Sequence, residues 1–415
     1  MKKILIILIA SLSIILITFL GWYLFLRNPE MPVAEVVRNV LPFGSGGDSN
    51  VPPLLPGNIE NTLGEPSSFD KYSEPTSKLF RISSAPVAGA VIFTRNGQPV
   101  VRYVDRATGH IYDVSLPTGA SSTPLEKIKI TNTTLPKIYQ AYFRPDGNAV
   151  LIRSLADDSD LVENFSLTLT APQSTSTGAL HNVSSTALRG DIDSVATGPS
   201  NTLFYTLKDT FSVMSSAFNG ASARIIFSST FNDWRLASAG NNLVIQTKAS
   251  ASAPGYVYTL NTSGGALTKI IGPLNGLVAT PNASGNRMLY SYVEGGRTKL
   301  FSRNLANNTS SEILPATLAE KCVWSVKKTE TLFCGAPIDS LRAGEPDNWY
   351  KGITHLSDRI WLFDTNIDIA QILAEPKQTL DIDLDVSEPK LSPDENYLVF
   401  INKSDLSLWA LRLEF

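Results

Sequence analysis

One pattern, a short apolar run followed by a tight polar turn, recurs along most of this chain. Val87–Thr94, Val100–Val104 and His110–Leu116 show it first: each is 5–8 residues long, and turn residues such as Asn96-Gly97 and Thr108-Gly109 separate them. Runs of this length, rich in Val, Ile and Tyr, are typical of β-strands. No long stretch with a helical period interrupts residues 78–415, so we predict an all-β domain there.

The same grouping of strands and turns recurs in six further units, which are Ile138–Leu169, Asp193–Phe218, Trp234–Leu260, Gly276–Leu305, Cys322–Phe363 and Pro389–Leu413. Comparable turns lie near Pro145, Pro199, Gly240, Pro281, Lys328 and Pro393, at steps of 54, 41, 41, 47 and 65 residues. Seven units over residues 78–415 average about 48 residues, and four-stranded units of about 40–50 residues are typical of β-propeller blades. We therefore predict a seven-bladed β-propeller with four-stranded blades. The alternative is a pair of β-sandwiches.

The last unit supplies only three clear strands, Glu388–Leu391, Tyr397–Asn402 and Leu406–Leu413. A strand from the start of the domain, Lys78–Ser83, is predicted to complete this blade. Such a closure covers a strand edge that would otherwise be free to pair with other chains.

Two of the turns have a characteristic sequence. FRPDGNAVLI (143–152) and LSPDENYLVF (391–400) resemble the Ser-Pro-Asp-Gly turn of WD40-like and TolB-type β-propeller repeat proteins. The resemblance covers residues 78–415 and implies a propeller that acts as a binding platform in the envelope or at the surface. This sequence lacks the α/β domain that precedes the TolB propeller, and it lacks the hydrolase domain of prolyl-oligopeptidase-like enzymes. The functions of those families are therefore not carried over.

The N-terminal segment differs from the rest of the chain. Ile4–Leu26 is 23 residues without a charge, long enough at about 1.5 Å per residue to cross a hydrocarbon core of about 30 Å. A secretory signal has an apolar core of only about 7–15 residues. We predict that residues 1–27 form a single transmembrane anchor, with its N-terminus in the cytoplasm because Lys2 and Lys3 precede the span and only Arg27 follows.

A proline-rich region follows the predicted anchor. Residues 28–77 contain eight of the 25 prolines and the run Gly44-Ser45-Gly46-Gly47. Proline removes amide donors and glycine adds chain entropy, so a disordered linker is predicted. Its expected role is to hold the propeller clear of the membrane, and the alternative is a recognition segment.

Composition excludes several kinds of partner and site. Only 18 % of residues are charged, the net charge is −3 and no basic block is present, so nucleic acid is not an expected partner. Two cysteines and three scattered histidines do not make a zinc site, and we expect no metal and no cofactor. Two acidic clusters are interpreted as a solvated turn, Asp157–Asp160, and a charged outer strand, Asp381–Asp385, rather than as metal sites.

Cys322 and Cys334 lie at the two ends of the segment CVWSVKKTETLFC. A tight turn near Lys328 would place them opposite each other in an antiparallel hairpin, close enough for a disulfide. Oxidation is allowed if the domain is exported. We predict the disulfide, and the alternative is two buried free thiols.

One segment fits no strand pattern. Ala336–Asp358 interrupts the sixth unit by about 20 residues, and long loops carry function more often than the scaffold does. The candidate binding residues in it are Arg342, Asp347, Trp349 and Tyr350, because aromatic and Arg side chains are favoured anchors of binding sites. The alternative is that Trp349 and Tyr350 pack the segment onto its own blade.

No catalytic residues are predicted, since the sequence contains no G-x-S-x-G, Walker loop, H-E-x-x-H or C-x-x-C motif. The predicted function is a membrane-anchored, extracytoplasmic, non-catalytic scaffold that binds a protein or glycan partner. The alternative is an envelope hydrolase that acts on glycans or peptides through carboxylates in the propeller funnel. A third possibility is a purely structural surface protein.

Overall fold

The computed structural model describes residues 72–156, 161–172, 179–231, 233–263 and 266–413, all within one compact unit, Ser67–Phe415. The predicted anchor and all but the last residues of the predicted linker lie outside the described residues. No helix in the described part is long and apolar enough to cross a membrane.

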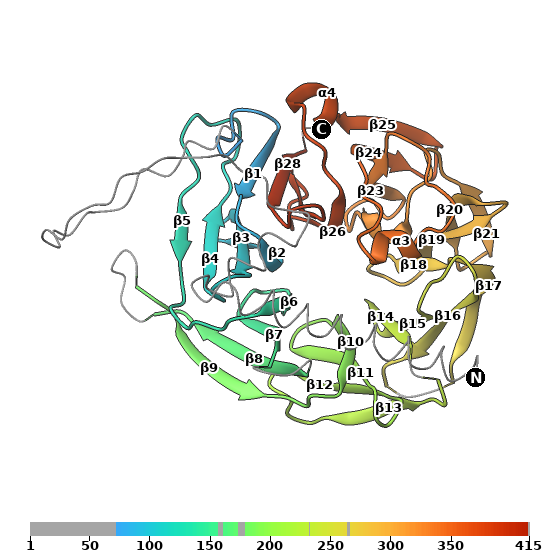
Figure 1. The fold of residues 1–415 in the computed structure, drawn as a ribbon, viewed down its shortest axis with the longest axis horizontal. Helices are drawn as coiled ribbons and strands as arrows, with labels where there is room; N and C mark the ends of the chain where they lie inside the picture. The colour runs from blue at the N-terminus through green and yellow to red at the C-terminus, as the bar shows by residue number, and fades with distance from the viewer. Residues whose placement is uncertain (1–71, 157–160, 173–178, 232, 264–265, 414–415) are drawn as a thin grey trace, which may run out of the picture. The chain divides into compact units, whose positions relative to one another are not determined.

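The described chain forms seven four-stranded antiparallel sheets around a central axis (Figure 1), which confirms the all-β, seven-bladed propeller. Blades 1 to 3 are β2 (Val87–Arg95), β3 (Gln98–Asp105), β4 (Ile111–Ser115), β5 (Lys127–Lys129); β6 (Ile138–Phe143), β7 (Ala149–Leu155), β8 (Val162–Thr170), β9 (Asn182–Ala187); and β10 (Ile192–Thr197), β11 (Thr202–Leu207), β12 (Ser212–Ala217), β13 (Arg224–Ser228). Blades 4 and 5 are β14 (Trp234–Ala239), β15 (Asn242–Thr247), β16 (Pro254–Asn261), β17 (Thr268–Asn275); and β18 (Val278–Pro281), β19 (Arg287–Glu294), β20 (Arg297–Asn304), β21 (Thr309–Glu312). Blade 6 is β22 (Cys322–Trp324), β23 (Thr331–Pro337), β24 (Asp358–Asp364), β25 (Ile369–Ala374), and blade 7 is β26 (Val386–Leu391), β27 (Tyr397–Asn402), β28 (Leu408–Arg412), β1 (Leu79–Ser83). The short helices are η1 (Ala319–Lys321), α3 (Asp347–Tyr350) and α4 (Pro376–Leu380).

The propeller is closed by its first strand. β1 pairs antiparallel with β28, with Leu79 opposite Leu411 and Phe80 opposite Ala410. This confirms that the segment predicted from Lys78–Ser83 supplies the outer strand of the last blade. Phe80 is fully buried there, and its ring meets that of Tyr397 edge to face at a centroid distance of 6.1 Å.

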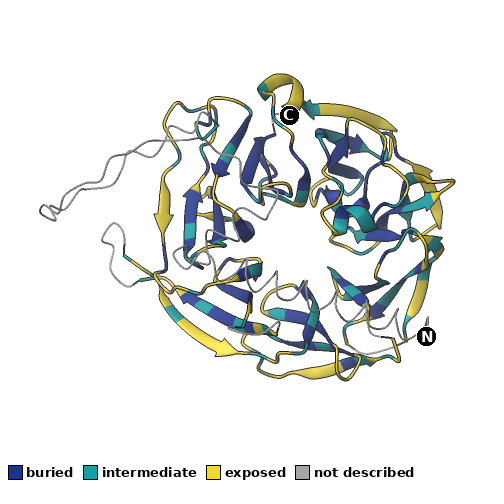
Figure 2. Cartoon of the chain, in the orientation of Figure 1, coloured by how far each residue is buried: buried dark blue, intermediate teal, exposed yellow. Residues whose placement is uncertain are grey.

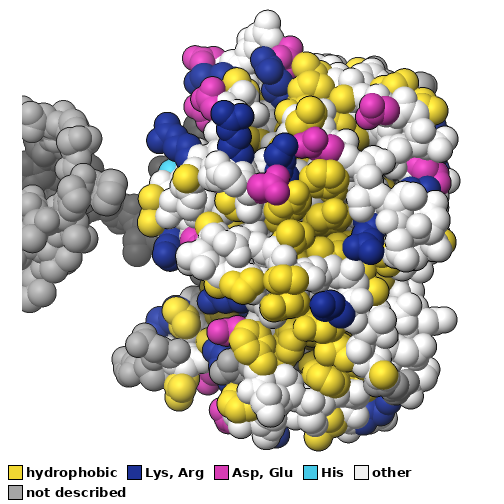
Figure 3. Space-filling view, turned by 90° about the vertical axis from the view of Figure 1, so that its right-hand side faces the viewer, with side chains coloured by type: hydrophobic (Ala, Val, Ile, Leu, Met, Phe, Trp, Pro, Cys, Tyr) yellow, Lys and Arg dark blue, Asp and Glu magenta, His cyan; other side chains and the backbone are white. Residues whose placement is uncertain are grey.

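Burial follows the position of each strand in its blade. β7, β11 and β27 are almost entirely buried, because both of their faces pack against neighbouring sheets. The outer strands β5, β9, β21 and β25 are mainly exposed (Figure 2). Figure 3 shows the face on the right-hand side of Figure 1, where hydrophobic side chains gather among charged ones.

The two turns that carry the sequence resemblance depend on left-handed backbone conformations. In blade 2, Gly147 has φ +74°, and a Cβ there would lie 2.7 Å from the ring of Phe93. In blade 7, Glu395 takes the equivalent position with φ +55°. Its carboxylate accepts hydrogen bonds from Ser325 Oγ at 2.7 Å and Val326 N at 2.7 Å, and so joins blade 7 to blade 6.

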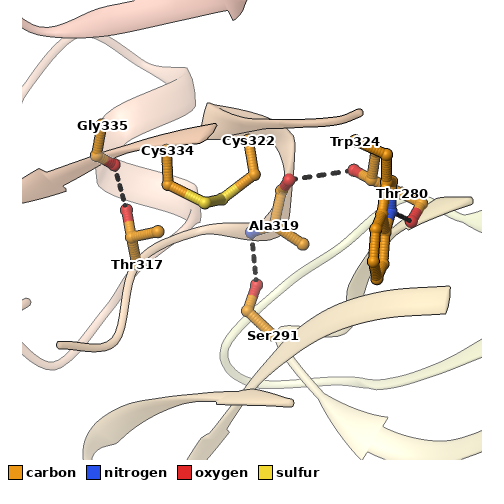
Figure 4. The surroundings of a disulfide bond; sticks show 8 residues. All are labelled: Thr280, Ser291, Thr317, Ala319, Cys322, Trp324, Cys334 and Gly335. Carbon is orange, nitrogen blue, oxygen red and sulfur yellow. Dashed lines mark hydrogen bonds between the residues drawn. A yellow bond between two sulfur atoms is a disulfide. The ribbon is translucent and has the colours of Figure 1, made fainter. Parts of the chain in front are cut away.

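Cys322 of β22 and Cys334 of β23 are register partners and form a disulfide in the structure (Figure 4). The adjoining segment is fixed by hydrogen bonds from Thr317 Oγ1 to Gly335 O (2.8 Å) and from Ala319 N to Ser291 Oγ (3.0 Å). These contacts tie η1 and the residues before it to blades 5 and 6. η1 carries Glu320 and Lys321, which both belong to the site described next.

Candidate functional site

A cavity of about 1000 Å³ lies on the propeller axis, since residues from all seven blades line it. Its lining comes from the first residues of the inner strands and from the loops that join the second and third strands. The charged lining residues are Arg106, Arg153, Asp193, Lys208, Asp233, Arg235, Lys248, Glu320, Glu388 and Lys403. Tyr139, Tyr142, Trp234 and Tyr350 add aromatic surface, so the cavity has the mixed lining typical of a ligand site.

The segment predicted as an insertion joins β23 to β24 at the same end of the propeller as this cavity. Residues 338–357 form the insertion, and α3 is its only helix. Glu345 is fully buried and organises it: its carboxylate accepts hydrogen bonds from Trp349 N at 2.8 Å and Thr354 Oγ1 at 2.6 Å.

Trp349 packs the insertion against the propeller. It is only 4 % exposed and lies among Leu318, Leu341 and Leu356. Its Nε1 donates to both carboxylate oxygens of Asp385, at 2.9 and 3.0 Å. The prediction that Trp349 binds a partner stays a prediction, since its side chain lines the cavity and also packs the insertion. The alternative, packing, describes it better, although the main polar contact is to blade 7 and not to its own blade.

Tyr350 has a different position, in the wall of the cavity. Its hydroxyl donates to Glu320 Oε1 at 2.5 Å, and the Arg235 guanidinium lies 4.1 Å from the centroid of its ring. Arg235 also forms an ion pair with Glu320 at 3.5 Å. Burial and the neighbouring Glu320 carboxylate hold the pKa of Tyr350 well above its ordinary value, so the hydroxyl keeps its proton at neutral pH. We call Arg235, Glu320 and Tyr350 the triad.

The other two candidate residues lie outside the cavity lining. Arg342 is exposed in the insertion. Asp347 Oδ2 accepts a hydrogen bond from Ala251 N of blade 4 at 2.6 Å, so it ties the insertion across to that blade. Of the four predicted residues, the structure brings only Trp349 and Tyr350 to the cavity. Arg235 and Glu320 were not predicted as site residues, because no sequence motif links β14, η1 and the insertion.

A buried ionic cluster lies beneath the insertion. Lys321 Nζ pairs with Asp358 Oδ2 at 2.9 Å and with Asp385 Oδ1, and all three side chains are fully buried. Asp385 also accepts hydrogen bonds from the insertion, at Leu356 N (3.2 Å) and at the indole of Trp349. The cluster therefore joins η1, β24, the segment that precedes β26 and the insertion.

The interpretation of Asp381–Asp385 as a charged outer strand is wrong. This segment follows α4 and precedes the inner strand β26, and it is not a strand. Asp381 and Asp383 are exposed, but Asp385 is buried because it has a buried partner in Lys321. That partner is distant in the sequence, so the alternation of acidic and apolar residues could not reveal it.

Asp358 makes the stability of the protein depend on pH. Burial raises its pKa to about 6; Lys321 opposes this shift, whereas the neighbouring Asp385 carboxylate adds to it. The native state thus binds a proton at Asp358 more tightly than the unfolded chain does. The contribution of this group to the free energy of unfolding is therefore full below about pH 4 and is lost as pH rises through about 6.

Asp358→Asn removes this proton-binding group. Between about pH 4 and pH 7, we expect the wild type to lose about 2 kcal/mol of free energy of unfolding relative to the variant. Urea unfolding followed by tryptophan fluorescence at a series of pH values measures it. Asp339→Asn, at an exposed position in the insertion, is the control and should show no such shift. A difference for Asp358→Asn that is constant with pH would contradict the assignment.

No group of three or more His, Cys, Asp or Glu residues in the described part of the chain is placed to hold a metal ion. The acidic cluster Asp157–Asp160 lies outside the described residues.

No family model matches this chain, and no curated protein matches it. Solved structures similar to it include a streptogramin B lyase, at 13 % identity over 81 % of this chain and 97 % of the other, with a TM-score of 0.47. The β-propeller domain of the Trilobed protease from Pyrococcus furiosus has 12 % identity, coverage of 80 % and 96 %, and a TM-score of 0.47. A putative TolB from Agrobacterium tumefaciens has 13 % identity, coverage of 56 % and 86 %, and a TM-score of 0.36. These names span different functions, and similarity at this level identifies no ligand or reaction.

Proposed function

We propose that this protein is a non-catalytic binding scaffold whose protein or glycan partner docks at the mouth of the central cavity, beside the triad. The observation that carries this proposal is the arrangement of the triad itself. A guanidinium, a phenol and a carboxylate from blade 4, the insertion and η1 hold one another in fixed orientations in the wall of a cavity of about 1000 Å³. Groups fixed before binding recognise a ligand at a lower entropic cost.

The chemistry of the triad favours recognition over catalysis. Tyr350 keeps its proton, so it is a hydrogen-bond donor rather than a base. Glu320 already accepts a hydrogen bond from the Tyr350 hydroxyl and forms an ion pair with Arg235. A ligand therefore meets the Arg235 guanidinium as a donor, and the Tyr350 oxygen and the Glu320 carboxylate as acceptors. Their neighbours orient all three groups, which suits binding without bond cleavage.

We propose that the propeller is held outside the cytoplasm by Ile4–Leu26. The uncharged length of that segment and the lysines before it support this placement. The Cys322–Cys334 disulfide is compatible with it, because oxidising compartments allow disulfides to persist. Protease added outside intact cells from which any outer barrier has been removed should digest the propeller, and full protection of the propeller would contradict the proposal.

Affinity capture with the full-length protein in detergent tests the binding site. We expect wild type to retain its partner, whereas Arg235→Ala and Tyr350→Phe lose most of it, because each removes one arm of the triad. Arg224→Ala is the matched control, since Arg224 lies exposed on the outer strand β13. Unchanged partner recovery by both triad variants, at unchanged thermal stability, would contradict this site.

A further inference from the structure

Four blades place a basic residue at one structurally equivalent position. Arg106, Lys208, Lys248 and Lys403 each directly follow the second strand of their blade, which is β3, β11, β15 or β27. All four line the central cavity. We call these residues the cation ring.

A repeated backbone hydrogen bond fixes this equivalence. In each of the four blades, the amide of the ring residue donates to the carbonyl of the residue just before the inner strand. These bonds are Arg106 N to Pro86 O (2.9 Å), Lys208 N to Asp191 O (2.9 Å), Lys248 N to Asp233 O (2.9 Å) and Lys403 N to Asp385 O (2.8 Å). In blade 2, Leu155 N donates the equivalent hydrogen bond to Lys137 O at 3.2 Å. The turn therefore does not require a basic residue at this position.

The cation ring is divided between two sides of the cavity. Arg106 and Lys403 belong to the adjacent blades 1 and 7, and Lys208 and Lys248 belong to the adjacent blades 3 and 4. In Figure 1 these two pairs of blades lie across the central opening from each other. A ligand that meets both pairs must therefore extend across the opening, with a negative charge near each of its ends.

The charges of the ring are only partly compensated. Lys208 has a carboxylate partner, Asp193, at 3.5 Å, but both side chains are well exposed. Arg106 Nε donates to the neutral Ile138 carbonyl at 3.0 Å, and Lys403 Nζ donates to the Trp349 carbonyl at 2.7 Å. Lys248 is exposed. The whole cavity lining holds six Lys and Arg against four Asp and Glu, although the chain as a whole has a net charge of −3.

We infer that the cavity binds an acidic peptide segment of a partner protein, with carboxylates at both ends and neutral residues between them. This inference rests on the proposed function and names its ligand class. The four lining carboxylates disfavour a polymer that is charged at every unit, such as a nucleic acid or a polyuronate, because some of its charges would face Asp233 or Glu388. A peptide can instead place neutral residues beside the triad and Tyr142.

Fluorescence anisotropy with the full-length protein tests this inference. The probe is a dye-labelled peptide with two glutamates at each end of a Ser/Gly/Tyr spacer, and its glutamine counterpart is the uncharged reference. We expect the glutamate peptide to bind, the glutamine peptide to bind at least about tenfold more weakly, and added NaCl to weaken the binding.

Matched variants assign the binding to the cation ring. Lys208→Ala with Lys248→Ala should weaken binding at least about fivefold. Lys129→Ala with Lys269→Ala removes the same charge from the exposed outer strands β5 and β17 and should change binding less than about twofold. Equal binding of the two peptides, equal loss in both double variants, or tighter binding of an oligogalacturonate probe would overturn the inference.

The two proposals can fail separately. If the glutamate peptide does not bind but partner capture still depends on Arg235, the acidic-peptide inference is wrong and the proposed site stands. If neither the peptide nor any captured partner depends on cavity residues, both are wrong.

Discussion

Lys321→Ala is expected to lower the free energy of unfolding by about 3–5 kcal/mol, the usual cost of breaking a buried ion pair by removing one partner. Its ammonium is the cation between Asp358 and Asp385, and all three groups are fully buried. Without it, two carboxylates would face each other away from water. Because protonation relieves that repulsion, the loss should be larger at about pH 8 than at about pH 5.

Chemical denaturation of wild type, Lys321→Ala and Lys351→Ala measures this effect. Lys351 lies exposed at the end of α3 in the insertion, so its replacement should cost less than about 0.5 kcal/mol. If Lys321→Ala is too unstable to purify, adding Asp358→Asn should restore part of the stability. Equal small losses for both lysines would show that the buried cluster does not hold the insertion and blades together.

Phe80→Ala is expected to destabilise the propeller by about 3–5 kcal/mol, since it empties a fully buried aromatic site. The position has a second consequence, because Phe80 lies on β1, the strand that closes the ring. Loss of its packing against Tyr397 loosens both the last blade and its junction with blade 1.

Thermal unfolding compares Phe80→Ala with Phe231→Ala, whose side chain is 42 % exposed. The loss at Phe231 should be less than half of that at Phe80, although Phe231 contacts Trp234. Phe80→Leu gives a milder version if the alanine variant does not fold. A stability loss at Phe80 no greater than at Phe231 would mean that the β1–β28 pairing is not essential to the fold.

The blade architecture could be predicted because it depends on local signals. Second strands such as β7 are mainly apolar and buried on both faces, and turns such as Arg144-Pro145-Asp146-Gly147 precede them. Even the closing strand could be predicted, from the missing fourth strand of the last unit. The outer strands were not individually predictable: β9 and β21, for example, are polar and exposed, so they carry no apolar pattern.

The site was much less predictable, because its contacts join residues that are far apart in sequence. Tyr350 was singled out as an aromatic residue in a long loop, but its partners Arg235 and Glu320 lie in β14 and η1. Trp349 was singled out by the same reasoning and is buried, since Asp385 offers its indole a partner. Composition does not distinguish an aromatic residue that binds a ligand from one that is buried in the fold. The position of its hydrogen-bond partner in the structure distinguishes the two.

Site-specific photo-crosslinking in the native cells tests most directly whether the cavity mouth is the binding site. A benzophenone amino acid replaces Val162 in one strain and Lys269 on the outer strand β17 in another; Val162 lines the cavity and belongs to neither the triad nor the cation ring. We expect a defined crosslinked partner from position 162, lost when Arg235→Ala is added, and none from position 269. A partner crosslinked from position 269 but not from position 162 would contradict the proposed site.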